Sequence, residues 1–134
     1  MKIARYTIGG SVTYGIVDGD SVRDINGTPF EKYDITDKVH KLTEVKLLTP
    51  AEPRNLMTTG NNTVSHATSK QNRANPRYKD FDPLAAKEVL ISIRSATSII
   101  AHEDPIIRPR EAEGITFREE VELVVVIGKQ CRRL

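Results

Sequence analysis

The feature that most constrains the fold is an acidic pair that runs directly into an apolar, β-branched segment near the end of the chain. Glu120 and Glu122 precede the run Leu-Val-Val-Val-Ile at residues 123–127. Such a run is typical of a strand that is buried on both faces of a sheet. Because side chains alternate along a strand, Glu120 and Glu122 are expected to project to the same side. A carboxylate pair at the start of a buried strand favours a site for a hard divalent cation.

The titratable residues also permit a simpler interpretation. The acidic pair is equally compatible with the solvent-facing edge of a strand. His40, His66 and His102 all lie on polar stretches, where solvated side chains are common. His66 nevertheless follows the turn at Gly60, at the end of an expected strand, and catalytic groups often occupy such loops.

Short strands separated by turns dominate the rest of the sequence, with little helix. Turn signals occur at Gly9-Gly10, Asp18-Gly19-Asp20 and Asn26-Gly27. Residues 63–72 are expected to form either a helical turn or an ordered loop, and residues 70–86 are expected to form a polar loop. These patterns predict an α+β protein that is mostly β, with a small β-rich domain over residues 1–50 and a second domain over residues 54–134. The expected strands are residues 2–7, 13–17, 21–25, 45–48, 55–59 and 89–93.

Composition excludes several classes of function. Twenty basic and eighteen acidic residues give a net charge of only +2, and Asp80 and Asp82 interleave the end of the basic and aromatic cluster at residues 70–82, so no nucleic-acid partner is expected. No apolar stretch reaches membrane-spanning length, and the first residues lack the pattern of a signal peptide. A lone Cys131 cannot form an internal disulfide. We therefore expect a cytoplasmic protein without a membrane partner.

Several short motifs follow one another along the chain in the order found in a known enzyme family. They are Met1-Lys2-Ile3-Ala4-Arg5-Tyr6, Tyr14-Gly15-Ile16-Val17-Asp18-Gly19-Asp20, Leu47-Leu48-Thr49-Pro50, Gly60-Asn61-Asn62-Thr63-Val64-Ser65-His66-Ala67, Arg94-Ser95-Ala96-Thr97-Ser98-Ile99-Ile100, Asp104-Pro105-Ile106 and Glu120-Val121-Glu122-Leu123-Val124-Val125-Val126-Ile127-Gly128-Lys129. Together they resemble the bacterial fumarylacetoacetate hydrolase family over nearly the whole chain. The resemblance implies a small N-terminal domain followed by a mixed β-sandwich or roll of that family's C-terminal type, of which this chain would hold the first part.

The resemblance also implies a function. Members of the family are divalent-metal enzymes, usually homodimers, that act on small 2-oxo or β-diketo acids by C–C bond hydrolysis, decarboxylation or isomerisation. Glu120 and Glu122 would hold Mg2+ or Mn2+ together with an Asp further on, and the metal would stabilise an enolate. His66 would act as general base, while Asn62 and Arg94 would contact the substrate.

The sequence departs from the family pattern at several positions. Thr63 replaces a Tyr, Ser69 replaces a Glu that orients the histidine, and Arg94-Ser95-Ala96 replaces Lys-Pro-Pro. In the family, the third metal-binding Asp lies beyond the Glu120-x-Glu122 strand. An alternative hypothesis is therefore a truncated, catalytically inactive relative that acts at most as a binding or assembly piece. Its terminal strand would lack neighbours and expose apolar side chains.

Overall fold

A computed structural model describes most of the chain, which divides into two compact units. One unit comprises Met1–Glu52 with Ile99–Leu134, and the other comprises Pro53–Ser98. The loop expected over residues 70–86 lies mostly outside the described residues. These are residues 1–60, 62–70, 74–76, 79–80, 82, 89–117 and 120–132.

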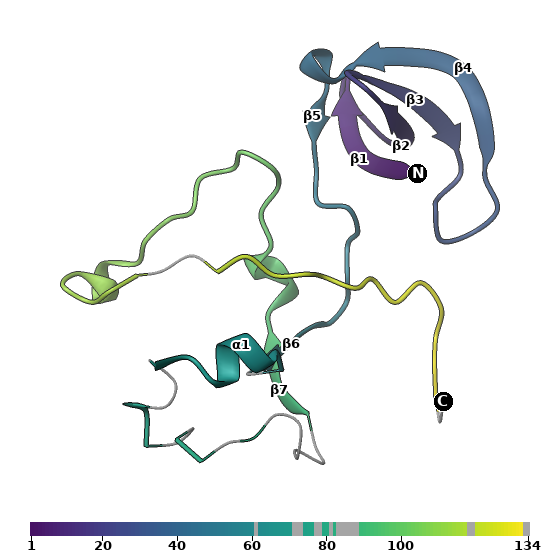
Figure 1. Ribbon diagram of the computed structural model, residues 1–134. Coiled ribbons are helices and arrows are strands. Elements are labelled where there is room, and N and C mark those ends of the chain that lie inside the picture. The colour runs from purple at the N-terminus through teal and green to yellow at the C-terminus, as the bar shows by residue number, and fades with distance from the viewer. Residues whose placement is uncertain are drawn as a thin grey trace. The chain divides into compact units, whose positions relative to one another are not determined.

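A five-stranded antiparallel sheet organises the first unit (Figure 1). The strand order is β4-β3-β2-β1-β5, so the first four strands form a meander and the fifth returns to pair with the first. The mostly β fold and the strands expected at residues 2–7, 13–17, 21–25 and 45–48 are confirmed. The elements are β1 (Lys2–Ile8), β2 (Ser11–Asp18), β3 (Ser21–Asn26), β4 (Asp34–Lys41), the 3-10 turn η1 (Leu42–Glu44) and β5 (Lys46–Leu47).

Glycines in the left-handed region make the tight turns between these strands. Gly9 and Gly10, between β1 and β2, have φ angles of 55° and 80°. Gly19, between β2 and β3, has a φ of 55°. Turns with positive φ match the twist of a hairpin, and glycine adopts them without the steric penalty of a Cβ. The two turns expected at these glycines are confirmed.

Strand β4 was not expected, because charge obscures its pattern. Four of the eight residues in DITDKVHK are charged. The strand lies at the edge of the sheet, where charged side chains are common, and its Ile35 and Val39 are 61% and 47% exposed. The register shifts between Arg23 and Ile25, which pair with Val39 and Ile35, so β4 itself carries the extra residues of a bulge or irregularity. Local hydrophobic alternation therefore gave no signal for this strand.

The core of the first unit is built around Tyr6. Tyr6, Val22 and Ile25 are only 0%, 0% and 3% exposed. The buried phenol donates a hydrogen bond to Oδ1 of Asp24, and Nε2 of His40 lies 3.3 Å from the same oxygen. The rings of Tyr6 and His40 meet edge to face, with centroids 6.4 Å apart. Burial, together with the bond to Asp24, raises the pKa of Tyr6.

Gly15 allows β2 and β3 to approach each other closely. A Cβ at this position would lie 2.6 Å from the backbone oxygen of Arg23 and 2.6 Å from Cγ2 of Val22. Such distances are well inside van der Waals contact, and the backbone oxygen belongs to a paired strand that cannot move freely. Only glycine fits here without shifting the ladder.

The described part of the second unit includes a two-stranded antiparallel sheet and a helical turn. Its register runs from Leu56 opposite Arg94 to Gly60 opposite Leu90. All five residues of the strand at Leu90–Arg94 are exposed. The strands expected at residues 55–59 and 89–93 are confirmed with ends shifted by one residue, as is a helical turn within residues 63–72. The elements are β6 (Leu56–Gly60), α1 (Val64–Ala67), β7 (Leu90–Arg94) and the 3-10 turn η2 (Ala96–Ser98).

The part of the first unit after residue 99 is mostly irregular. It holds one 3-10 turn, η3 (Arg110–Ala112). The guanidinium of Arg108 donates to the carbonyl oxygens of Ala112 and Ile115, the second at 2.8 Å, and so satisfies backbone acceptors around this turn. Within the described ranges, no helix combines the length and the hydropathy needed to cross a membrane.

The prediction of a buried strand at residues 123–127 is wrong. No strand is assigned within residues 120–132, which Figure 1 draws as the continuous coil near the C-terminus. Leu123 is 94% exposed and Ile127 is 72% exposed. The physical reason is that a strand forms only where a neighbour accepts its backbone hydrogen bonds, and no described segment pairs with this one. High β-propensity alone does not supply that neighbour.

Replacing Gly15 with Ala should destabilise the first unit by about 1 to 3 kcal/mol, because the new Cβ collides with β3. Thermal and urea unfolding followed by circular dichroism would measure the loss. Gly60→Ala is the matched control, since its Cβ would lie 3.9 Å from Cβ of Leu90, an ordinary contact. Equal losses in both variants would contradict the close approach of β2 and β3.

Alkaline pH should weaken the first unit through Tyr6. The pKa of Tyr6 is raised above its ordinary value of 10.0, so the unfolded chain loses this proton before the folded chain does. The stability that the phenol contributes is therefore complete below about pH 10 and is lost as the pH rises further. Urea unfolding of the wild type at increasing pH should show this decline.

The Tyr6→Phe variant should be less stable at neutral pH and should lose less further stability in alkali, because it has no phenol to titrate. Removing the hydrogen bond leaves the Asp24 carboxylate short of a partner, at a cost of about 1 to 3 kcal/mol. Tyr33→Phe is the control, because the Tyr33 hydroxyl contacts only exposed Sδ of Met1 among the described residues. Identical pH slopes in the wild type and Tyr6→Phe would refute the assignment.

Candidate active site

His66 lies in α1, the single helical turn that follows β6. The preceding residue, Thr63 at the N-cap, has an extended backbone with φ −114° and ψ 140°. At the other end, the N–H and the hydroxyl of Thr68 both donate to the carbonyl oxygen of Val64, at 3.0 Å and 2.7 Å. These bonds fix the backbone of the turn, while the His66 residue is exposed. A fixed backbone with an exposed imidazole suits the predicted proton-moving role.

Asn62 lies between β6 and α1 and is tied to the strand. Its Nδ2 donates to Oγ1 of Thr59 at 2.6 Å, across the point where the chain leaves the sheet. In the described part of the chain, the Asn62 side chain has no other hydrogen-bond partner. Its amide oxygen is therefore available to accept a hydrogen bond from a ligand.

Arg94 lies at the opposite end of the two-stranded β6–β7 sheet. Arg94 is paired with Leu56, whereas Gly60, which leads towards Asn62, is paired with Leu90. The ends of a five-residue strand are about 13 Å apart. The second unit thus brings Asn62 and His66 to one end of this hairpin, and Arg94 occupies the other end.

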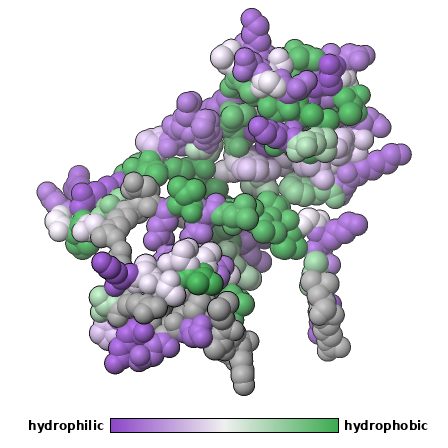
Figure 2. Space-filling model, viewed as in Figure 1, coloured by the Kyte–Doolittle hydropathy of each residue, from purple (hydrophilic) through white to green (hydrophobic). Residues whose placement is uncertain are grey.

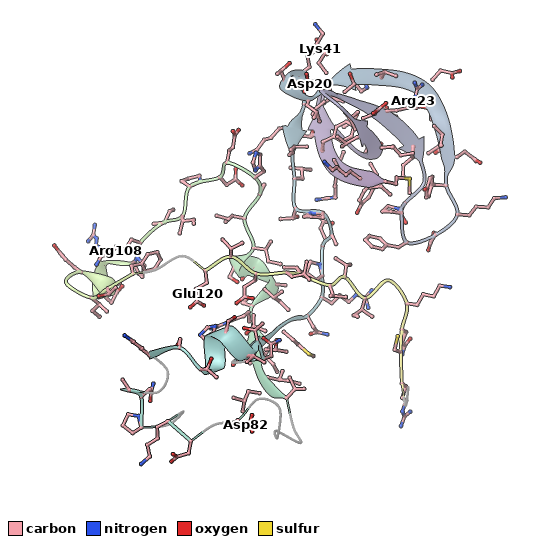
Figure 3. All side chains as sticks on the ribbon, viewed as in Figure 1. Asp20, Arg23, Lys41, Asp82, Arg108 and Glu120 are labelled. Atoms are coloured by element: carbon pink, nitrogen blue, oxygen red, sulfur yellow. The ribbon has the colours of Figure 1, made fainter. Side chains whose placement is uncertain are left out.

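Glu120 and Glu122 belong to the first unit, on the segment without strand pairing. Both residues are exposed, and Figure 3 shows Glu120 projecting from this segment. Neither carboxylate forms an ion pair with another described residue. The described residues contain no group of three His, Cys, Asp or Glu side chains that could hold a metal. The pair therefore offers two hard oxygen ligands, a donor set that suits Mg2+, which commonly binds one or two carboxylates and retains water.

Asp104 closes a turn and has a partner that the sequence did not indicate. Its N–H donates to the carbonyl oxygen of Ala101 at 3.2 Å, and Ala101 N–H donates to Oδ2 of Asp104 at 3.0 Å. Glu103, inside the turn, has a φ of 63°. Nζ of Lys46 lies 2.9 Å from Oδ1 of Asp104. The bond from Lys46, followed by that from Ala101, lowers the pKa of Asp104. The Asp-Pro pair signals the turn, but no local pattern indicates a lysine on β5.

Two protein-family models match this sequence, one over its first part and the other over the rest. Residues 1–50 match the N-terminal region of Rv2993c-like proteins. Residues 55–134, more than half of the chain, match the C-terminal domain of fumarylacetoacetate hydrolase. The chain belongs to the fumarylacetoacetate hydrolase family. The resemblance noted in the sequence is thereby confirmed.

The relatives that this chain matches are longer than it is. Protein Rv2993c of Mycobacterium tuberculosis is 27% identical over 139 residues, which cover 98% of this chain and 48% of that protein. The structure of Cg1458 with an inhibitor has a TM-score of 0.63 at 22% identity and covers 84% of this chain and 41% of that one. The 5-carboxymethyl-2-hydroxymuconate delta-isomerase of Mycobacterium smegmatis has a TM-score of 0.56 at 21% identity, covering 75% and 35%. These two structures establish the likeness of fold, and the chain spans less than half the length of each relative.

The predicted site residues all fall inside the stretch that matches the fumarylacetoacetate hydrolase C-terminal domain. The acidic pair belongs to the first structural unit, and the other three residues belong to the second. Their individual roles stay predictions. The residues are Asn62, His66, Arg94, Glu120 and Glu122.

Replacing Lys46 with Met should raise the pKa of the Asp104 carboxyl towards its ordinary value of 3.8, because the strongest partner of the carboxylate is lost. A carbon-13 NMR titration of the carboxyl groups would measure the change. Lys38→Met, on β4, removes the same charge elsewhere and should leave this titration unchanged. An equal change in both variants would point to net charge rather than to the contact between Lys46 and Asp104.

Proposed function

We propose that this chain forms part of an enzyme that acts on small 2-oxo or β-diketo acids. The observation that carries the proposal is the match of residues 55–134 to the fumarylacetoacetate hydrolase C-terminal domain, which includes His66 and the acidic pair. A structural neighbour is named as a delta-isomerase, which supports chemistry in which a proton moves next to a conjugated acid. Hydrolysis, decarboxylation and isomerisation share such a step.

A divalent cation, Mg2+ or Mn2+, would be held by Glu120 and Glu122. Support comes from the donor chemistry, since both carboxylates are exposed and have no competing ion pair among the described residues. When bound, such a cation acts as a Lewis acid that stabilises negative charge on a substrate oxygen. The remaining coordination positions would be open to water and substrate oxygens.

We propose separately that polar residues of the second unit bind the acid and move its proton. His66 is the proposed general base, because imidazole is the commonest proton-transfer group in enzymes and this one is exposed on a fixed turn. Arg94 offers a planar, two-pronged donor for a substrate carboxylate. Asn62 would orient the substrate through its amide oxygen, since its Nδ2 is already committed to Thr59.

Adding Mg2+ should raise the melting temperature, because a ligand that binds only the folded state stabilises it by about 2.7 kcal/mol at about 100 times its Kd. Differential scanning fluorimetry across a Mg2+ series would show the shift. The Glu122→Ala variant should lose it, whereas Glu113→Ala, which removes an exposed carboxylate from the turn after η3, should retain it. Retention of the full shift in both variants would indicate nonspecific cation binding and contradict the assignment to the acidic pair.

The same preparation should convert an acylpyruvate or oxaloacetate when Mg2+ is present. His66→Gln should abolish this turnover while leaving the Mg2+-induced shift in melting temperature intact, because the imidazole moves a proton and is not a proposed ligand. Product formation is measured by the change in ultraviolet absorbance of the substrate. Absence of both turnover and thermal shift at high protein concentration would refute the proposed function for this chain.

A further inference from the structure

The second unit is an insertion in the first, so the chain passes between the two units twice. It leaves the first unit after Glu52 and returns to it at Ile99. The outgoing segment carries the carboxylate of Glu52, and the returning segment carries that of Asp104. Each of these carboxylates forms an ion pair with a cation of the N-terminal sheet. Side-chain contacts, and not only chain connectivity, therefore hold both segments on the first unit.

Arg5, on β1, holds the outgoing segment through its backbone and through its side chain. Its carbonyl oxygen accepts a hydrogen bond from the N–H of Leu48 at 2.8 Å. Its guanidinium Nη2 donates to Oε1 of Glu52 at 2.6 Å. The Arg5 side chain is only 12% exposed, whereas that of Glu52 is 75% exposed. A side chain that packing already restricts loses less conformational freedom when it pairs, so Arg5 is the fixed member of this contact.

Lys46, on β5, holds the returning segment through Asp104. Its Nζ donates to Oδ1 of Asp104 at 2.9 Å. The second carboxylate oxygen, Oδ2, accepts a hydrogen bond from the N–H of Ala101 at 3.0 Å. The turn therefore orients the carboxylate towards the sheet independently of Lys46. An oriented partner reduces the entropic cost that usually leaves surface ion pairs weak.

The two cations are neighbours on one face of the sheet. Lys46 is paired with Thr7, and Arg5 precedes Thr7 by two positions on β1. Since paired residues and alternate residues share a face, Arg5 and Lys46 are diagonal neighbours, about 7 to 8 Å apart. Like charges at this separation repel each other, and the carboxylates of Glu52 and Asp104 offset the repulsion. The two ion pairs therefore depend on one another.

We propose that these two ion pairs form an electrostatic clasp, which holds the outgoing and returning segments on the N-terminal sheet and thereby restricts the motion of the inserted unit. Hinge motions are absorbed by a few residues where the chain passes between units, and the clasp restrains the segments that would absorb them. The clasp needs neither a bound metal nor turnover, so it stands or fails separately from the proposed function. Its members are Arg5, Glu52, Lys46 and Asp104.

Hydrogen exchange followed by mass spectrometry tests the clasp in the full chain. Lys46→Glu places a second carboxylate beside that of Asp104 and also competes for Arg5, so both segments should loosen. We expect the amides of residues 99–104 and 48–52 to exchange about two- to fivefold faster, which is the effect of losing an exposed ion pair. Unchanged exchange in both segments would overturn the proposal.

Two matched variants serve as controls for charge and for position. Lys46→Arg keeps the positive charge at the same place, so both segments should exchange as in the wild type. Lys38→Glu makes the same change of charge on β4, at the other edge of the sheet, and should also leave both segments unchanged. Equal acceleration in Lys38→Glu and Lys46→Glu would show that net charge, rather than the clasp, controls the exchange.

Salt tests the clasp in the wild type without any substitution. Figure 2 shows many hydrophilic side chains at the surface, and the side chains of Lys46 and Glu52 are 60% and 75% exposed. Dissolved ions should therefore reach both pairs, and about 1 M NaCl shortens the screening length to about 3 Å. Exchange in the two segments should accelerate at high salt, while the paired amides of β2 and β3 should not change. Equal exchange of the two segments at low and high salt would contradict the clasp.

The width of a spin-label distance distribution tests the restricted motion directly. In a Cys131→Ser background, one label is placed at Asp37→Cys on β4 and the other at Met57→Cys on β6, where both residues are exposed. Pulsed electron resonance should give a broader distribution in Lys46→Glu than with the native lysine, because the inserted unit has lost part of its restraint. Equal widths would show that the ion pairs do not restrict the inserted unit.

Discussion

Backbone pairing is the constraint on which this structure depends. A backbone N–H or C=O group that is removed from water needs a hydrogen-bond partner, and a strand is therefore stable only as part of a ladder. Five segments of the first unit satisfy one another in this way, and two do so in the second. Residues 123–127 have stronger β-propensity than much of β4, yet β4 is a strand and they are not. The presence of a neighbour, rather than propensity, separates the two.

The sequence was informative where local signals determine structure. Glycines such as Gly9 and Gly19, which have positive φ, predicted the turns of the hairpins, and apolar alternation predicted the strands on either side of these turns. Sequence-based prediction failed where the structure of a segment depends on a partner that is distant in the sequence. The pairing of β4 with β3 is made possible by an edge position and a bulge, and neither leaves a pattern in DITDKVHK. The buried hydrogen bond from Tyr6 to Asp24 likewise joins two strands, β1 and β3. Neither segment alone indicates that these two side chains meet.

The candidate site likewise has residues that the sequence identifies and contacts that only the fold determines. Family motifs located Asn62, His66 and the acidic pair, because their order along the chain is a property of the sequence. The relation of Arg94 to the other residues depends on the β6–β7 register, which pairs it with Leu56 at the end of the hairpin away from Gly60. The ion pair between Lys46 and Asp104 spans 58 positions and likewise follows from the fold. The order of motifs in the sequence identifies the candidate residues, whereas the pairing of strands determines which of them lie close together.

The exposed hairpin of the second unit has a consequence for ligand affinity. Two-stranded sheets are marginally stable by themselves, and here the two ends of such a sheet carry Arg94 and the turn that leads to Asn62. A ligand that engaged either end would first have to hold this sheet in one conformation. Part of its binding free energy would be spent on that ordering, so the observed affinity would understate the strength of the individual contacts. Whatever covers the hairpin in advance would act as a positive effector without touching the ligand.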